Sequence, residues 1–596
     1  MALGVGCTLG YLVWRAGWSL GGASWWLSVP LFVGEVIAAL ALIALVDCAW
    51  RSEATAAPRR RRPEPVDIYV LAGAWSADVV RSTLLACAEV RGHTRTWVLH
   101  HGRPDIAALA AALGHESLEV PTDDPVGAVT HACGRTTGDL VLLLDGSDLP
   151  LPDALHSFGA VFDDPWCAVL QLRRGAYNHE GARHLGIGRD VRSVHDEVVL
   201  PGLDSFGAAH WEGAGAILRR VAMVEVGQHS GPAGALGASV ALQSAGWSIR
   251  ARREVVAVGL APDDEATLVR ESAARQRAVS RWFASSQGPW RTPGLTPAQR
   301  LGHTVTAAAA LHATAWARVL RVVVLAVALC SATTPFPLNA ATVGLLWLPA
   351  MLTGAVAAAV ARGGRLSAAD VAGLELSRLP LPFDRARRCP PAALPAALAS
   401  LLAVGVAVSV VRLVSVGPSA QGRFGLAVLV VAGTVGFARQ VGAAWRHRRT
   451  EQRRSAHRFS CEEPAVLGDA PATVVNVSSS GTSLLLDAPV GVGGKASMEM
   501  WLDTPDGSLA SVSTHCTILW CAPEGGRWVA GVRFDRPPVS ALDHIARFCG
   551  VVRVTEAVRG LPPYLIDYVD EVDRSAPPTP ARFDLGAPLA PVRAAA

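Results

Sequence analysis

The chain has little charge, almost no lysine and no metal-type cysteine pattern. Only 17% of its 596 residues are charged, whereas a soluble enzyme normally carries about a quarter. Lysine occurs only at Lys495, and the formal net charge of +4 is too small to indicate a nucleic acid polymer as partner. The eleven cysteines form no CxxC pair and no His/Cys spacing suited to zinc, so we interpret them as small core residues.

Hydrophobic residues, in contrast, make up 51% of the chain and gather in long runs. Residues 28–49 are long enough to cross a bilayer whose apolar core is about 30 Å thick. The run at 4–14 is short, and it is either a truncated span or no span. Residues 298–317 are typical of an amphipathic helix that approaches the membrane. The remaining candidate spans are 318–334, 341–361, 392–411 and 424–445.

Arginine clusters orient these spans by the positive-inside rule. Arg59 to Arg62 follow the first clear span, the loop 362–391 is rich in arginine, and further arginines follow the last span. The uncharged turn at 335–340 fits the outer side. The pattern predicts a multi-pass α-helical membrane protein, with residues 51–297 and the C-terminal part in the cytoplasm.

The segment between the first and second spans predicts a soluble α/β domain. Residues 66–72, 96–102 and 139–148 are short apolar runs typical of buried strands, and a helix-like stretch at 77–91 lies between the first two. Strands that alternate with helices predict βαβ units and a largely parallel sheet. Ligands of such sheets bind at the carboxyl ends of the strands.

Two polar pairs follow these predicted strands. Asp145 and Asp148 can hold Mg²⁺ if the turn brings them together, or they can form a strand-end turn in which Asp accepts backbone hydrogen bonds. His100 and His101 are adjacent in a strand and therefore point to opposite faces, which favours a polar strand end over a metal pair.

Residues from about 453 to 556 predict a small β-barrel, because short alternating strands are broken there by Gly, Pro and Asn. The expected strands are 472–477, 482–487, 496–502, 512–521 and 527–534. The Pro/Ala-rich tail from 574 is predicted to be disordered.

Two short motifs flank the start of this barrel. Arg454 and Arg458 form an RxxxR pair, and the preceding Arg453 offers an additional contact. About twenty residues later comes an NxSxxG turn, made of Asn476, Ser478 and Gly481. Taken alone, the arginines are equally typical of basic charge beside a membrane.

Together the two motifs resemble the signature of PilZ domains. The resemblance implies that cyclic di-GMP is an allosteric ligand. The chemistry agrees, because arginine pairs with phosphate or with guanine O6/N7 and stacks on the base plane. Asn and Ser supply short polar groups, and Gly permits a close backbone approach.

Most of the chain before the barrel resembles the bacterial cellulose synthase branch of family-2 glycosyltransferases. The likeness rests on RSTLLACAEV (81–90), DDPWCAVLQLRRGAYN (163–178), WEGAGAILRRVAMVEVG (211–227), GLAPDD (259–264) and the Arg281-Trp282 pair, which fits the RW of the QxxRW motif on the acceptor side. The resemblance implies a GT-A-like fold, a UDP-sugar, a growing glycan and, if the transferase is active, Mg²⁺.

The transferase motifs themselves have degenerated. His100-His101-Gly102 replaces the DDG that holds uridine, and Asp145-Gly146-Ser147 replaces the DxD that holds the metal. Ala233-Gly234-Ala235 stands where the TED motif supplies the general base. Asp263, Asp264 or Glu212 are the candidate substitutes for that base.

Three hypotheses follow. The first is a pseudo-glycosyltransferase that responds to cyclic di-GMP and regulates or scaffolds exopolysaccharide production, with an active synthase or an export protein as partner. The second is an active, divergent, processive β-glycan synthase activated by cyclic di-GMP. The third is a membrane receptor with no glycan role.

The predicted organisation has six parts. They are an N-terminal transmembrane segment (1–50), a basic linker (51–65), a glycosyltransferase-2-like domain (66–297), a transmembrane bundle with its approach helix (298–445), a PilZ domain with a basic linker (446–573) and the tail (574–596).

Overall fold

The computed structural model describes most of the chain. The described residues are 1–20, 24–52, 66–155, 161–177, 194–226, 234–260, 265–363, 393–415, 420–446 and 457–558.

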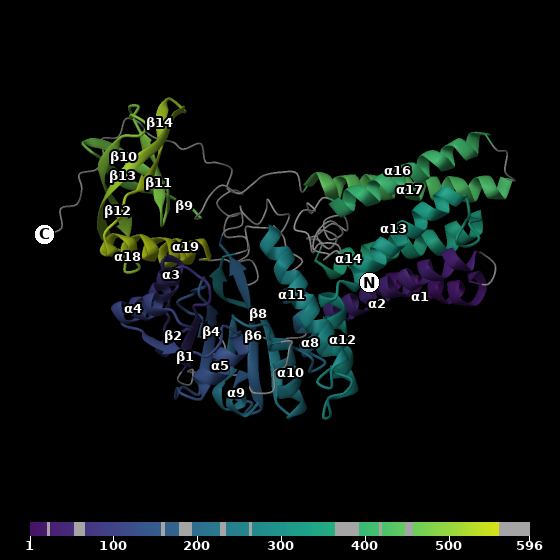
Figure 1. Cartoon of the computed structure of the whole chain (residues 1–596), viewed down its shortest axis with the longest axis horizontal. Coiled ribbons are helices and arrows are strands. Elements are labelled where there is room, and N and C mark those ends of the chain that lie inside the picture. Colours follow the sequence, from purple (N-terminus) through teal and green to yellow (C-terminus); the bar gives the residue numbers. More distant parts are fainter. Residues whose placement is uncertain are drawn as a thin grey trace.

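Five of the helices in these ranges are long and apolar enough to cross a membrane. They are Trp25–Ser52 (α2), Ala313–Ser331 (α13), Thr342–Ala361 (the π-helical turn η6, Thr342–Trp347, followed by α14, Leu348–Ala361), Ala393–Ser415 (α16) and Arg423–Gly442 within α17 (Ala420–Arg446). Each of the five apolar runs expected from residue 28 onward overlaps one of these helices, although the run 318–334 extends past the end of α13 at Ser331. The chain therefore has the helical bundle of a multi-pass membrane protein, drawn on the right of Figure 1.

The short run at 4–14 is a helix, α1 (Ala2–Trp14), which packs against α14 and α2. It continues into the π-helical turn η1 (Arg15–Ser19), where the Arg15 side chain is fully buried. Arg15 Nε donates to Glu35 Oε2 at 3.1 Å, and Tyr11 donates its hydroxyl proton to Glu35 Oε1 at 2.7 Å. Because an unpaired charge is costly in an apolar bundle, this pair fixes α1 to α2.

The α/β domain contains an eight-stranded mixed sheet in the order β3-β2-β1-β4-β7-β6-β8-β5. The strands are β1 (Val66–Leu71), β2 (His93–His100), β3 (Glu116–Glu119), β4 (Leu140–Asp145), β5 (Leu149–Pro150), β6 (Cys167–Ala176), β7 (Ala216–Arg219) and β8 (Ser248–Gly259). Strands β1 to β4 are parallel to their neighbours in this group, and β6 is parallel to β8. Antiparallel β7 lies between the two groups.

Alternation along the strands gives this sheet a core on each face. In β4, Leu140, Leu142 and Leu144 pack into one cluster, while Val141 and Leu143 pack into the other. Both sets are almost inaccessible to solvent, as expected for a sheet covered by helices on both sides. The helices are α3 (Ala77–Ala88), α4 (Pro104–Ala112), α5 (Pro125–Cys133), α9 (Arg220–Val226) and α10 (Ala235–Ser244).

Further helices join this domain to the bundle. Helix α8 (Leu200–Asp204) packs on the end of α2, where Gly202 lies so close to Cys48 that a Cβ would overlap it. Helix α11 (Glu265–Ala284) leads to α12 (Pro297–Ala310), which begins with a capping box between Thr296 and Gln299. His312 is left-handed, with φ of 54°, and separates α12 from α13.

The C-terminal strands form a closed six-stranded barrel in the order β10-β11-β14-β13-β12-β9. They are β9 (Phe459–Leu467), β10 (Ala470–Ser478), β11 (Gly481–Leu486), β12 (Lys495–Asp503), β13 (Leu509–Glu524) and β14 (Arg527–Phe534). Helix α18 (Val539–Arg547) adds Ala541 and Ile545 to the barrel core, and α19 (Val554–Val558) follows it. In Figure 1 the barrel lies above α3, on the side of the α/β domain away from the bundle.

Candidate functional site

The carboxyl end of β4 carries both strand-end carboxylates. The chain turns directly after Asp145, and the Asp148 amide closes the turn by donating to the Asp145 carbonyl oxygen at 2.9 Å. Asp148 Oδ2 in turn accepts from the Asp145 amide at 2.8 Å. A Cβ at Gly146 would lie 2.8 Å from Cδ1 of Trp75, so glycine is required for this close packing.

Arg174, near the end of β6, neutralises these carboxylates. Its Nε donates to Asp148 Oδ1 at 3.0 Å, and its Nη2 lies 3.6 Å from Asp145 Oδ2. Asp145 Oδ1 accepts from Trp75 Nε1 at 2.9 Å. Asp148 is completely buried, and this burial raises the pKa of its carboxyl group although Arg174 opposes the change.

Asp145 and Asp148 do not fit Mg²⁺ in this arrangement. The ion requires near-octahedral oxygen ligands at about 2.0–2.1 Å and usually retains several waters. Here Asp148 has no solvent-exposed surface, and both carboxylates already bind donors from the protein. The Arg174 guanidinium supplies the positive charge that a metal would otherwise bring.

The other predicted positions of this domain are dispersed. His101 Nδ1 bonds to the Val120 carbonyl at 2.8 Å, whereas His100 Nδ1 accepts from the Arg103 amide at 3.4 Å, so the two histidines have separate partners. Trp282 is fully buried in an apolar cluster, while Arg281 is exposed and donates to its own helix at the Arg277 carbonyl. Asp263, Asp264 and Ala233 lie outside the described residues.

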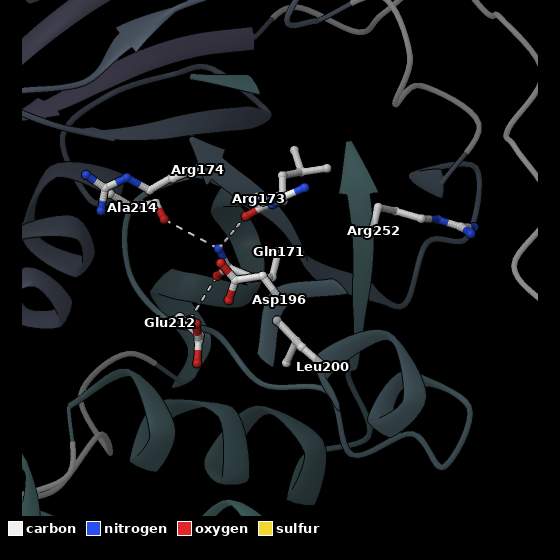
Figure 2. A pocket seen from close by; sticks show the side chains of 9 residues that line it. Gln171, Arg173, Arg174, Asp196, Leu200, Glu212, Ala214 and Arg252 are labelled. Atoms are coloured by element: carbon white, nitrogen blue, oxygen red, sulfur yellow. Dashed lines mark hydrogen bonds between the residues drawn. The ribbon is translucent and has the colours of Figure 1, made fainter. Parts of the chain in front are cut away.

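A pocket opens beside the end of β6 (Figure 2). Gln171 connects its walls, because it accepts from the Glu212 amide at 2.9 Å and donates to the Ala214 carbonyl at 3.4 Å. The pocket is lined by Gln171, Leu172, Arg173, Arg174, Asp196, Leu200, Glu212, Ala214 and Arg252. Three of these residues are arginines, but Arg173 pairs with Glu197 and Arg174 pairs with Asp148.

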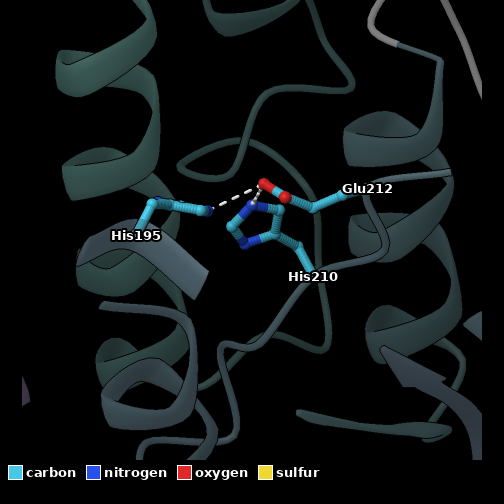
Figure 3. Close-up of side chains that lie close together, drawn as sticks. All are labelled: His195, His210 and Glu212. Carbon is cyan, nitrogen blue, oxygen red and sulfur yellow. Dashed lines mark hydrogen bonds and ion pairs between the residues drawn. The ribbon is translucent and has the colours of Figure 1, made fainter. Parts of the chain in front are cut away.

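Two histidines share the Glu212 carboxylate at the edge of this pocket (Figure 3). His195 Nε2 lies 2.8 Å and His210 Nε2 lies 3.2 Å from Glu212 Oε1. His210 is almost fully buried, and burial lowers its pKa. Burial also acts against charge on the other two groups, but their mutual attraction prevails: it raises the pKa of His195 and holds that of Glu212 well below its usual range.

The sequence motifs at the barrel lie around the β10–β11 hairpin. Asn476 is near the end of β10, and its Oδ1 is buried without a hydrogen-bond partner among the described residues. Ser478 Oγ donates to the Gly481 carbonyl at 2.9 Å, and Arg458 Nη1 donates to Ser483 Oγ at 2.9 Å. Arg453 and Arg454 lie outside the described residues.

Gly481 also has a structural role, which the NxSxxG motif alone did not indicate. A Cβ at this position would overlap the Val532 carbonyl oxygen of β14. The glycine is therefore needed for strand pairing inside the barrel, in addition to any ligand contact.

The barrel and the α/β domain meet through three kinds of contact. Tyr177, just after β6, stacks on Phe459 with ring centroids 5.7 Å apart. Arg81 of α3 forms an ion pair with Asp543 of α18 at 2.6 Å. An apolar cluster joins the two sides, with Ala86, Leu149, Val255 and Val258 from the α/β domain and Val551 and Val554 from the C-terminal helices.

Comparison with known proteins agrees with the two resemblances. Residues 447–550 match the PilZ domain family. A "Cellulose synthase 1" of Komagataeibacter xylinus is 29% identical over 279 residues, which cover 43% of this chain and 18% of the relative. The "Cellulose synthase 1 catalytic subunit [UDP-forming]" of the same organism is 28% identical over 320 residues, which cover 49% of this chain and 42% of the relative.

Among solved structures, S. aureus TarS is 9% identical and covers 79% of this chain and 72% of its own, with a TM-score of 0.27. A likeness this low carries no functional argument. The curated relatives extend well beyond the aligned region, because the chain spans about a fifth and about two fifths of their lengths. The chain is thus similar to cellulose synthases over about half its length and carries a PilZ domain.

Proposed function

We propose that this protein is a cyclic di-GMP-binding pseudo-glycosyltransferase that regulates or scaffolds exopolysaccharide production. Its α/β domain and barrel are cytoplasmic and its bundle spans a bacterial inner membrane. An active synthase or an export protein is the partner that such a role requires.

The observation that carries this proposal is the pairing of Arg174 with Asp145 and Asp148. Inverting sugar transfer from a nucleotide needs a cation on the leaving diphosphate and a carboxylate that accepts the acceptor proton. At the strand end where the resemblance places the metal, a side-chain guanidinium pairs with both carboxylates. Unlike Mg²⁺, an arginine side chain has no open coordination positions at which the diphosphate oxygens could bind.

The positions aligned with the uridine and base motifs support the same conclusion. His100 and His101 replace carboxylates and make bonds to the backbone of their own domain. Gly234 and Ala235 lie at the start of α10, and neither residue has a carboxylate side chain. Loss of a general base alone typically removes about 10²–10⁴-fold of rate.

The barrel surface supports cyclic di-GMP as the signal. Arg458 and Asn476 lie on adjacent strands or at their ends, since Asn476 pairs with Ser483 in the β10–β11 ladder and Arg458 bonds to Ser483. The buried Oδ1 of Asn476 lacks a protein partner among the described residues, and a guanine N–H would satisfy it.

The effect of cyclic di-GMP binding to the barrel can be transmitted to the α/β domain through the contact between Tyr177 and Phe459. Phe459 directly follows Arg458, and Tyr177 lies three residues after Arg174. A ligand that holds Arg458 in a new position would shift a domain contact only if it binds one arrangement better than the other. The basic segment 446–458 that joins barrel and bundle is the second route; most of it lies outside the described residues.

An active, divergent β-glycan synthase that uses a UDP-sugar is the second candidate. Glu212 favours it, because this residue places a largely buried carboxylate in a pocket lined by arginines. However, the two histidines keep the pKa of Glu212 low, and a carboxylate with a low pKa is a weak proton acceptor.

Calorimetry on the full chain in nanodiscs tests the proposal. Cyclic di-GMP is expected to bind, whereas UDP with Mg²⁺ or Mn²⁺ is expected to give no binding heat. Tight, metal-dependent UDP binding would favour the active synthase. Absence of cyclic di-GMP binding would refute the signalling role.

A further inference from the structure

The cluster of His195, His210 and Glu212 has the composition of a transition-metal site. Each residue directs one donor atom to the same point, and the three donor atoms lie within 4.8 Å of one another. Two imidazole nitrogens and one carboxylate oxygen suit Zn²⁺ and similar ions, whereas Mg²⁺ prefers oxygen ligands alone.

The distances within the cluster are close to those of a tetrahedral site. Zn²⁺ binds nitrogen and oxygen at about 2.0–2.2 Å, which separates neighbouring ligand atoms by roughly 3.3 Å. The Nε2 atoms of His195 and His210 lie 2.8 and 3.2 Å from Glu212 Oε1. An ion beside Glu212 therefore requires each histidine nitrogen to move away from Glu212 Oε1 by only a few tenths of an ångström, and all three donor atoms already lie within 4.8 Å of one another.

The backbone that carries two of the donors is held firmly. Trp211, between His210 and Glu212, is buried, and its amide donates to Ser239 Oγ at 2.8 Å. Its indole Nε1 donates to the Gly213 carbonyl at 2.8 Å, and the Glu212 amide donates to Gln171 Oε1 at 2.9 Å. Fixed outer-shell contacts of this kind orient metal ligands and strengthen binding.

The third donor comes from a separate element. His195 begins the π-helical turn His195–Val199 (η3), which leads into α8 beside the membrane helix α2. A metal ion would therefore cross-link the segment 210–212, which precedes β7, to the segment that contacts the membrane bundle. Such a link stabilises the folded protein by an amount that grows with the logarithm of the ratio of free ion concentration to Kd.

One nearby positive charge has to be accommodated. Arg275 Nη2 lies 3.7 Å from Glu212 Oε1, but its side chain is 61% exposed and belongs to α11. Because it is long and mostly in solvent, it can turn away when an ion neutralises Glu212.

We propose that His195, His210 and Glu212 bind a Zn²⁺-class divalent ion, with the fourth coordination position facing the arginine-lined pocket. Three protein ligands leave this position for water or an anionic oxygen. The site is distinct from the strand-end carboxylates, and it does not depend on transferase activity or on cyclic di-GMP.

The test is metal binding by the full chain, without a polyhistidine tag, in nanodiscs. After chelator treatment, the protein is titrated with Zn²⁺, and with Co²⁺ to follow its visible absorption. We expect one ion per chain, retained on dialysis, with a Co²⁺ spectrum typical of tetrahedral coordination by nitrogen and oxygen. Zn²⁺ should also raise the melting temperature.

Two variants identify the ligands. His195→Ala and Glu212→Gln should each weaken Zn²⁺ binding at least about a hundredfold, beyond the roughly 10–100-fold cost of losing an outer-shell partner. His131→Ala is the matched control, since His131 lies near the surface on α5, where it contacts Arg135. If one variant is unfolded, its melting curve will show this. The Zn²⁺ affinity of the other variant then decides whether the cluster binds the ion.

The proposal is overturned if the parent protein retains no Zn²⁺, or if both variants bind it as tightly as the His131→Ala control. In either case the cluster is an ion pair and hydrogen-bond network that neutralises Glu212.

Discussion

Arg174 Nε lies 3.0 Å from Oδ1 of Asp148, although Arg174 is on β6 and Asp148 is in the turn between β4 and β5, 26 positions earlier. The contact depends on β6 lying beside β8, where Arg174 pairs with Ala257 in the ladder. Gly259 completes the arrangement, because a Cβ there would overlap the same Asp148 oxygen. Asp148 is thus enclosed by protein, while the partly exposed Asp145 is held by Arg174 and Trp75.

Arg174→Ala should make the protein responsive to Mg²⁺. The variant leaves Asp145 and the buried Asp148 without their cation, which typically costs about 3–5 kcal/mol for a buried pair. An added divalent ion can recover part of this loss. Melting temperature with and without Mg²⁺ measures the effect: no shift is expected in the parent and an increase is expected in the variant. A double variant, Arg174→Ala with Asp145→Asn, should respond less. An Mg²⁺-dependent increase in the parent would contradict the substitution of a metal by Arg174.

Arg458→Ala should weaken cyclic di-GMP binding by about 2 kcal/mol or more, typical of a lost hydrogen-bonded charge. This corresponds to roughly thirtyfold in Kd. Arg527→Ala is the control, because Arg527 lies at the opposite end of the barrel and pairs with Asp487. Equal affinities of the two variants in calorimetry would remove Arg458 from the binding site.

Gly481→Ala should destabilise the barrel by about 1–3 kcal/mol, since its Cβ would overlap the Val532 carbonyl oxygen. Gly491→Ala should change stability by less than about 0.5 kcal/mol, because a Cβ there meets nothing within 4 Å. Scanning calorimetry of the full chain compares them. If both substitutions are equally tolerated, the close approach of β11 to β14 is not a constraint on this glycine.

Glu463→Gln should make the barrel less sensitive to pH. Burial of Glu463 on β9, followed by repulsion from Asp503, raises the pKa of its carboxyl group to about 7. Its protonated form is therefore favoured in the folded state, and the associated stability is present below about pH 4.5 and is lost as the pH rises through about 7. At pH 8 the neutral variant should be more stable than the parent by about 1–2 kcal/mol, and at pH 4 the two should be similar.

The adjacent Glu462 is the control for this prediction, since its side chain is exposed. Glu462→Gln should leave the difference between the melting temperatures at pH 4 and pH 8 unchanged. A Glu463→Gln profile identical to that of the parent would show that this carboxyl group ionises freely in the folded barrel.

Much of the architecture could be predicted because many of the helices and strands are indicated by a pattern within their own segment of the sequence. The apolar runs from residue 28 onward have the length that a helix needs to cross the apolar core of a bilayer. Alternation in the barrel strands marks their buried side. Strand β9 was not predicted, because Glu462, Glu463 and Pro464 interrupt its pattern, although it closes the barrel between β10 and β12.

Contacts between distant segments could not be predicted in the same way. The neighbours of Asp148 depend on strand order and register, which no local pattern defines. Likewise, His195 precedes His210 by fifteen residues, outside any standard zinc spacing, and only the short His-x-Glu at 210–212 was a local signal. The roles of Arg458, Asn476, Ser478 and Gly481 in ligand binding remain predictions for the experiments above.

UDP release from the full chain in nanodiscs tests the central claim most directly. The assay uses a panel of UDP-sugars with Mg²⁺ or Mn²⁺, with and without cyclic di-GMP, and Asp145→Ala as the control variant. We predict no turnover above that of the control under any condition, together with preserved cyclic di-GMP binding. Turnover that rises with cyclic di-GMP and disappears in Asp145→Ala would contradict the account and establish an active synthase.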